Sequence, residues 1–223
     1  MPSEIVVYGA SGQAKAYRCM LIECKLARVV AFIDDFRGDR GEEIAGSPVI
    51  SFETWRNRLQ THPCLISIGD PAAKRRLAQR VLDAGGTFCR LHDAAGTGFP
   101  GVSVGADSLL ARPAYVGPGS QVGEHVAIMP MSTLGHDVEV GDFCTVCPGA
   151  NVGGYVIIES GTFIGAGAVI MNGSAGRPLV IGSGATVAAG AVVTRPVPAG
   201  ATVMGNPARP LRELARRKRR PDP

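Results

Sequence analysis

Aliphatic residues recur at every sixth position through the second half of the chain. Twelve stand in unbroken register from Val104 to Ile170, and the register resumes at Ile181, Val187 and Val193 after a slip of five residues. A small or β-branched residue follows four places after these positions, forming a second column: Ser108, Ala114, Ser120, Val126, Ser132, Val138, Cys144, Ala150, Val156, Thr162 and Ala168. Two aligned columns over this length indicate a repeat architecture.

A six-residue period fits neither an α-helix nor an ordinary hairpin strand, because those have periods of 3.6 and 2. It fits one wall of a three-sided coil, with the aliphatic residue pointing inward and the small residue filling the remaining interior. Eighteen residues then make one coil. The pattern predicts four coils over residues 104–175 and a fifth over 181–198, with a loop at 172–180 that projects from a corner.

Residues 1–91 follow a different pattern, in which short apolar runs alternate with helical spacing. The apolar runs at residues 5–8, 29–33 and 65–68 predict strands, and the spacing around 14–24, 52–59 and 73–84 predicts helices. Alternating strands and helices with short connections are typical of a parallel sheet with right-handed crossovers. We therefore expect an α/β domain over 1–91, a coil domain over 92–210 and a tail over 211–223.

Composition and charge narrow the functional classes. Only 5% of residues are aromatic, whereas there are 30 glycines and 16 prolines, which disfavours a helical bundle. The net charge of +4 equals the excess in the last 13 residues, where 6 basic side chains meet 2 acidic ones. A nucleic-acid-binding domain would instead spread basic residues over a folded face, so we expect no nucleic-acid partner and interpret the tail as solvated.

The chain is expected to act in the cytoplasm. Its first residues do not resemble a signal peptide, and its apolar stretches are too short or too rich in glycine to cross a membrane. The six cysteines are scattered along a chain too long for a disulfide scaffold, so they are expected to be reduced thiols.

Two segments within this pattern make the resemblance specific. The run from Gly135 to Phe143, which reads GHDVEVGDF, and the ending GNPAR at residues 205–209 resemble those of the left-handed β-helix acyltransferases. With an N-terminal domain that contains Gly9-x-x-Gly12, the chain to about residue 212 is similar to one branch of them. That branch contains bacterial nucleotide-linked amino-sugar N-acetyltransferases and sialic acid O-acetyltransferases.

The resemblance implies catalytic roles for three residues. His136 would face the amine or hydroxyl that is acylated, and its neighbour Asp137 would orient the imidazole and keep it basic. The backbone N–H of Gly154 would stabilise the oxyanion of the tetrahedral intermediate. Glycines at 153 and 154 would also suit a corner that has no catalytic role.

The same resemblance implies where acetyl-CoA, the expected co-substrate, would bind. Its pantetheine arm would lie in a groove between adjacent prisms and bond to the backbone at Ala166 and Ala189. The GNPAR ending would place Gly205, Pro207 and Arg209 near the nucleotide end, where a guanidinium suits a phosphate.

The N-terminal glycines resemble a turn that holds a phosphate at the start of a helix. In the similar transferases this turn and an acidic pair after the second strand hold the nucleotide of the sugar. Six residues correspond to them: Gly9, Ser11, Gly12, Asp34, Asp35 and Gly69. A plain α/β turn without a ligand would show the same glycines.

Metal chemistry is not expected. Cys144-x-x-Cys147 has no second pair, and Cys144 belongs to the inward column. Zinc carbonic anhydrases share this type of repeat, yet they need several outward histidines, and the repeats contain only His125 and His136. His125 lies three places after Val122 and has no partner like the one His136 has in Asp137, so we expect it on the surface.

Together, these observations predict a Rossmann-like α/β domain followed by a left-handed β-helix of about five coils. They favour an acetyl-CoA-dependent N-acetyltransferase that acts on a nucleotide-linked amino sugar without a metal. The alternatives are O-acetylation of a sialic-acid-type sugar and a non-catalytic nucleotide-sugar-binding protein. The resemblance also implies a homotrimer with sites between subunits.

Overall fold

The computed structural model describes residues 3–91, 101–211 and 213. The chain forms two compact units, residues 1–91 and residues 92–223. The predicted basic tail, residues 211–223, lies outside the described residues except for residues 211 and 213. No helix in the described ranges is long and apolar enough to cross a membrane.

The first unit is a five-stranded sheet with three helices. The strands run in the order β3-β4-β2-β1-β5, and all neighbours are parallel except β3 and β4. The strands are β1 (Ser3–Tyr8), β2 (Ala27–Ile33), β3 (Glu43–Ile44), β4 (Ser47–Ile50) and β5 (Cys64–Ile66). The helices are α1 (Gly12–Glu23), α2 (Phe52–Arg58) and α3 (Pro71–Asp83).

Local sequence explains where two of these helices begin. The hydroxyl of Ser51 accepts a hydrogen bond from Thr54 N, and the carboxylate of Asp70 accepts one from Ala73 N, so each side chain caps a helix. The antiparallel pair β3–β4 did not appear in our sequence prediction. Its turn at Ala45 and Gly46 has positive φ at both residues, and Gly46 was the available signal.

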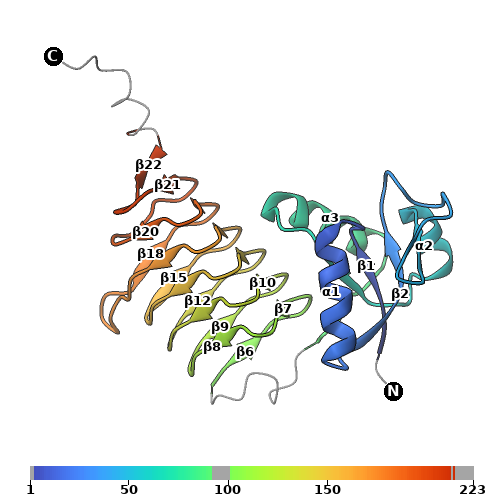
Figure 1. Ribbon diagram of the computed structural model, residues 1–223, viewed down its shortest axis with the longest axis horizontal. Helices are drawn as coiled ribbons and strands as arrows, with labels where there is room; N and C mark the ends of the chain where they lie inside the picture. Colours follow the sequence, from blue (N-terminus) through green and yellow to red (C-terminus); the bar gives the residue numbers. More distant parts are fainter. Residues whose placement is uncertain (1–2, 92–100, 212, 214–223) are drawn as a thin grey trace. The chain divides into compact units, whose positions relative to one another are not determined.

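The second unit is a three-sided prism whose coils stack along one axis (Figure 1). Wall 1 contains β6 (Ser103–Val104), β9 (Gln121–Val122), β12 (Glu139–Val140), β15 (Val156–Ile158) and β18 (Leu179–Ile181). Wall 2 contains β7 (Leu109–Leu110), β10 (Ala127–Ile128), β13 (Thr145–Val146), β16 (Phe163–Ile164), β19 (Thr186–Val187), β21 (Thr202–Met204) and β22 (Arg209–Pro210). Wall 3 contains β8 (Tyr115–Val116), β11 (Thr133–Leu134), β14 (Asn151–Val152), β17 (Val169–Ile170) and β20 (Val192–Val193).

Residues eighteen positions apart pair between coils, as the repeat predicts. Thr133 on wall 3 pairs with Tyr115 on one side and with Asn151 on the other. The insertion after β17 forms a short antiparallel pair between Ser174 and Arg177, and the ladder resumes at Leu179. The repeat of eighteen therefore stacks chemically important residues directly above one another.

The predicted inward columns form the prism's core. From Val116 onward every aliphatic residue of the column is buried, whereas Val104 and Leu110 at the open end are half-buried. The buried hydroxyls of the small-residue column are satisfied across coils. Ser120 Oγ, for example, donates to Gly135 O and accepts from Val138 N, so a polar core residue costs little here.

Candidate functional site

His136 and Asp137 lie at the corner between wall 3 and wall 1, which we call corner 3–1. They follow β11 and precede β12. Corner 3–1 carries His136, Gly154, Asn172 and Arg195 on successive coils, because each stands two residues after an inward aliphatic. The imidazole of His136 is 55% exposed, in keeping with the expectation that it faces outward.

The two side chains of corner 3–1 form a hydrogen-bonded pair. Nδ1 of His136 lies 2.8 Å from Oδ2 of Asp137. A carboxylate at Nδ1 favours the neutral tautomer that carries its proton on Nδ1. Nε2 then keeps a lone pair that can accept a proton from another molecule.

Glycines on the two neighbouring coils make room for this pair. A Cβ at Gly154 would lie 2.7 Å from Nε2 of His136, and a Cβ at Gly119 would lie 2.5 Å from Oδ1 of Asp137. Both distances are too short for real atoms, so any other residue would displace the imidazole or the carboxylate. Sequence analysis missed Gly119, although it precedes Asp137 by the eighteen residues of one coil.

The amide of Gly154 is open, unlike its counterparts at another corner. At corner 1–2, between walls 1 and 2, side chains cap the corresponding amides: Asp142 accepts from Glu124 N at 2.8 Å, and Glu159 accepts from Ser183 N at 2.7 Å. Within the described residues Gly154 N–H has no acceptor. An unpaired donor beside the imidazole is what stabilisation of an oxyanion requires.

The expected pantetheine contacts lie on a different corner. Ala166 and Ala189 stand at corner 2–3, between walls 2 and 3, and their amides also lack acceptors in the described part of the chain. Corner 2–3 and corner 3–1 are the two edges of wall 3. One chain therefore does not bring Gly154 together with Ala166 and Ala189.

The GNPAR ending borders a cavity at the C-terminal end of the prism. The chain reverses between β21 and the antiparallel β22, and Pro207 and Arg209 line a cavity of about 320 Å³. Gly205, whose φ is +89°, is not among its lining residues. Arg195 lines it as well, and neither guanidinium forms an ion pair with any described residue.

Arg195 is a candidate that sequence analysis did not identify. Its position in the repeat could have identified it. Arg195 stands two residues after the inward Val193, and His136 likewise stands two residues after the inward Leu134. Two arginines and the carboxylate of Glu213 border the same cavity, so the cavity presents net positive charge. This environment suits a phosphate group.

In the first unit, the predicted glycine turn lies at the carboxyl ends of the strands. Gly9 has a φ of +113°, and a Cβ there would lie 2.6 Å from Ser67 Oγ. Ser11 precedes α1 without capping it, and the position of a Cβ on Gly12 is open. Gly69 follows β5 and lies beside the Gln13 side chain. The start of α1 is therefore accessible to a ligand.

The two acidic residues after β2, Asp34 and Asp35, have different hydrogen-bond partners. Oδ1 of Asp34 accepts hydrogen bonds from Phe36 N and Arg37 N and so shapes its own turn. Asp35 accepts from the guanidinium of Arg80 at 2.8 Å and from the hydroxyl of Tyr8 at 2.9 Å. Burial, followed by the neighbouring Asp35 carboxylate, raises the pKa of Tyr8, so its hydroxyl stays protonated and donates.

The expectation for His125 was wrong. His125 is buried, its Nδ1 lies 2.7 Å from Oδ2 of Asp107, and its ring stacks on Phe143 with 4.6 Å between centroids. The reason is again the coil: Asp107 and Phe143 lie eighteen residues before and after His125. A partner that is distant in sequence is adjacent in space.

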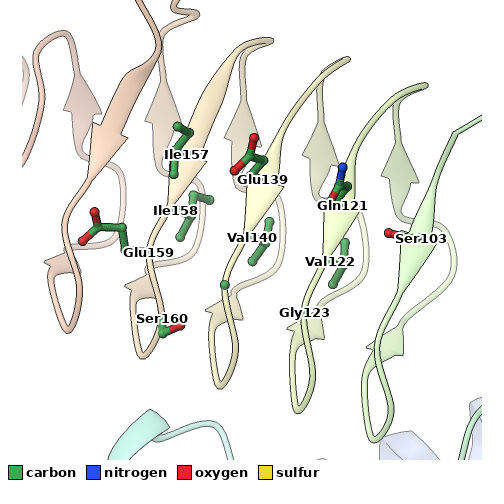
Figure 2. Close-up of a pocket in the computed structure, with 11 residues that line it drawn as sticks. Ser103, Gln121, Val122, Gly123, Glu139, Val140, Ile157, Ile158, Glu159 and Ser160 are labelled. Carbon is green, nitrogen blue, oxygen red and sulfur yellow. The ribbon is translucent and has the colours of Figure 1, made fainter.

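A shallow groove of about 350 Å³ runs along wall 1 and reaches corner 1–2, where Gly123, Gly141 and Ser160 line it (Figure 2). Gln121 and Glu139 project from successive strands along it, and Ser103 extends the polar column. Glu139 is two residues beyond Asp137. The groove thus offers an amide, a carboxylate and a hydroxyl to a polar ligand on wall 1.

Cys144 is fully buried inside the prism, as its place in the inward column predicted. Within the described ranges, no three or more histidine, cysteine, aspartate or glutamate side chains are grouped so that they could hold a metal ion.

Comparison with protein families matches both units. Residues 4–81 match the PglD N-terminal domain, and residues 119–154 match six repeats of the bacterial transferase hexapeptide family. A segment of 56 residues is 59% identical to GDP-perosamine N-acetyltransferase from Escherichia coli O157:H7. That match covers 25% of this chain and 25% of the enzyme.

Solved structures match over nearly the whole chain. WeeI from Acinetobacter baumannii AYE is 33% identical, with a TM-score of 0.84 over 94% of this chain and 100% of that chain. The acetyltransferase domain of PglB from Neisseria gonorrhoeae FA1090, solved with acetyl coenzyme A, is 26% identical, with a TM-score of 0.80 over 95% of this chain and 100% of that chain. These matches confirm the predicted fold class. The chain belongs to the hexapeptide-repeat sugar N-acetyltransferases, in which a left-handed β-helix follows a PglD-type N-terminal domain.

Proposed function

We propose that this chain transfers the acetyl group of acetyl-CoA to the amine of a nucleotide-linked amino sugar. The observation that carries the proposal is the arrangement at corner 3–1. A carboxylate-bound imidazole with a free Nε2 lies against the open amide of Gly154. A proton acceptor and an oxyanion donor are the two groups that acyl transfer between a thioester and an amine needs.

The reaction proceeds by direct attack in a ternary complex. The sugar nitrogen attacks the thioester carbonyl carbon while Nε2 of His136 takes the proton that this nitrogen loses. The carbonyl oxygen becomes an oxyanion that accepts a hydrogen bond from Gly154 N–H. When the intermediate collapses, the carbon–sulfur bond breaks and the thiolate takes the proton from the imidazolium. The products are the amide and CoA with a free thiol.

The acceptor is a sugar carried on a nucleotide, with a GDP-linked amino sugar as the first candidate. The matched segment of the Escherichia coli GDP-perosamine N-acetyltransferase supports this choice. The start of α1 at Ser11 and Gly12 would receive the diphosphate, because helix N-termini attract anions. In the groove on wall 1, Gln121 and Glu139 would hydrogen-bond to polar groups of the sugar nucleotide.

Acetyl-CoA would extend from corner 3–1 toward the C-terminal end. The open amides of Ala166 and Ala189 would bond to the pantetheine arm, while Arg195 and Arg209 would receive a phosphate. Corner 3–1 carries Arg195 three coils beyond His136, roughly 14 Å along the prism at the usual spacing of strands. This distance suits the extended pantetheine arm of acetyl-CoA. The proposed acetyl transfer needs no metal.

The active assembly is a homotrimer in which wall 3 of each prism faces the threefold axis. Exposed apolar side chains gather on wall 3 and its edges, among them Tyr115, Met131, Val169 and Met171. This packing would set corner 3–1 of one prism beside corner 2–3 of the next. Each site would then combine His136 and Gly154 with Ala166 and Ala189 of a neighbour. We place the enzyme in the cytoplasm, the compartment that supplies acetyl-CoA.

A substrate panel tests the proposed activity. Thiol release from acetyl-CoA is measured with GDP-, UDP- and dTDP-linked amino sugars and with sialic acid, and the products are identified by mass spectrometry. We expect release only with a nucleotide-linked amino sugar. Release with sialic acid alone would indicate the O-acetyltransferase alternative. Binding of nucleotide sugars without thiol release would indicate a non-catalytic binding protein.

A further inference from the structure

The imidazole of His136 has one more neighbour, the ring of Tyr155. The two ring centroids lie 4.9 Å apart, and the planes meet at 89°, an edge-to-face contact. Tyr155 directly follows Gly154, and its N–H donates to His136 O at 3.1 Å. Tyr155 therefore contacts His136 twice: its backbone N–H bonds to the His136 carbonyl, and its ring packs against the His136 imidazole.

Asp137 alone does not fix the plane of the imidazole. Its hydrogen bond holds one atom, Nδ1, and both side chains are about half exposed. A planar ring held at one atom can still tilt about that point. Gly154 has no side chain to hold the ring, and a Cβ there would lie only 2.7 Å from Nε2. Tyr155 supplies a contact at the ring itself, which restricts the tilt that the other two neighbours permit.

The backbone of Tyr155 lies in a left-handed corner position, as do those of five other non-glycine residues of the described prism: Asp107, His125, Met131, Asp137 and Phe143. Tyr155 has a φ of +54°, in the left-handed region where glycine is the unstrained residue. The residue one coil below Asp137, at the same place of the corner, is glycine, Gly119. The corner therefore accepts several residue types, and the role of Tyr155 is argued from the contact that its ring makes with His136.

Corner 1–2 holds a second contact between an aromatic ring and an imidazole, with a different geometry. There Phe143, with a φ of +61°, lies parallel to the residue directly beneath it, His125, at an interplanar angle of 11°. At corner 3–1 the residue directly beneath Tyr155 is Asp137, which bonds to its own neighbour. The ring of Tyr155 meets His136 instead.

We propose that Tyr155 is a positioning residue for the acetyl transfer, acting through the ring of His136. This inference rests on the proposed function, in which His136 Nε2 accepts the proton. The aromatic ring, and not the phenol hydroxyl, holds the imidazole plane so that Nε2 points at the acceptor amine. Edge-to-face contacts are modest, so loss of the ring should lower kcat about 3- to 10-fold.

Three substitutions at Tyr155 separate the ring from the hydroxyl and from backbone strain. Tyr155→Leu removes the ring and should lower kcat with little change in the KM of either substrate. Tyr155→Gly removes the ring and also relieves the strain at positive φ, so it should fold and show the same loss. Tyr155→Phe keeps the ring and should retain most of the turnover. Phe143→Leu is the matched control, because it removes an aromatic ring at positive φ from another corner and should leave kcat unchanged.

A double substitution tests whether Tyr155 acts through the imidazole. On a His136→Asn background, Tyr155→Leu should not lower the residual rate further, because no imidazole remains to be positioned. An unchanged kcat in both Tyr155→Leu and Tyr155→Gly, a Phe variant as slow as the Leu variant, or a further loss on the Asn background would each overturn the inference. Full turnover by His136→Asn itself would overturn the proposed function, and the positioning role with it.

Discussion

At the scale of single residues, the site depends as much on missing side chains as on those present. His136 and Asp137 occupy space that a Cβ on Gly154 or Gly119 would fill. The amide of Gly154 is an open donor because no side chain caps it, unlike the amide of Glu124 at corner 1–2. Two glycines therefore determine where the imidazole and the carboxylate can lie.

Gly119→Ala tests this steric account. The new Cβ would push against Oδ1 of Asp137, so we expect kcat to fall about 10-fold while the protein remains folded. Gly184→Ala is the matched control. Gly184 has a similar φ, +65° against +73° for Gly119, but has open space at its Cβ, so it carries the same strain without the collision. Steady-state rates and thermal midpoints of both variants decide the matter. Equal losses of turnover in the two variants would show that strain, not the displaced carboxylate, is responsible.

At the scale of elements, each corner is a column whose members are eighteen residues apart, or twenty-three where the insertion after β17 intervenes. Corner 3–1 runs from His136 through Gly154 to Arg195, so the chemistry and a phosphate-binding side chain share one edge. A column of this kind gives a long, thin co-substrate contacts on successive coils.

Arg195→Gln tests the far end of that column. Loss of a charged hydrogen-bond donor to a phosphate should raise the KM of acetyl-CoA about 10-fold or more and leave the KM of the sugar nucleotide unchanged. Arg177→Gln, which removes an exposed arginine from the insertion after β17, is the control and should change neither. Initial rates measured while each substrate is varied give both constants. If Arg195→Gln raised only the KM of the sugar nucleotide, the direction assigned to the co-substrate would be reversed.

The walls could be predicted from sequence, whereas neighbours within the corners could not. The column of aliphatic residues that begins at Val104 predicts the strands of the walls, because one inward residue recurs every six positions. His136 and Asp137 could be found because they are adjacent in the chain. His125 and Asp107, by contrast, are eighteen residues apart, and so are Gly119 and Asp137. Such pairs emerge only when the coil length is applied to polar residues as well as to the core.

At the scale of the whole molecule, wall 3 separates two groups of candidate residues. His136 and Gly154 lie at one edge of this wall, and Ala166 and Ala189 lie at the other. About five residues of extended chain lie between the edges, roughly 16 Å. One chain cannot close that distance, but two neighbouring prisms can.

Mixing two inactive variants tests the shared site. Ala189→Pro removes an amide donor at a corner position where Pro130 and Pro148 stand on earlier coils, so the backbone should tolerate it. His136→Asn removes the base. Trimers that combine the two chains should regain about one wild-type site in three, with activity at low acetyl-CoA that neither parent shows. Sedimentation confirms that the mixed species are trimers. No recovery in mixed trimers would mean that each chain carries a complete site.

The proposed proton acceptor is tested most directly by the turnover of His136→Asn with a GDP-linked amino sugar and acetyl-CoA. Loss of a general base typically costs about 10²–10⁴-fold, so we expect kcat to fall by that factor while calorimetry still shows both substrates bound. Asp137→Asn should lose less, because the imidazole remains. His62→Ala, which alters an imidazole of the first unit, should behave as wild type. Undiminished turnover by His136→Asn would contradict the account, because the amine would then reach the thioester without this base.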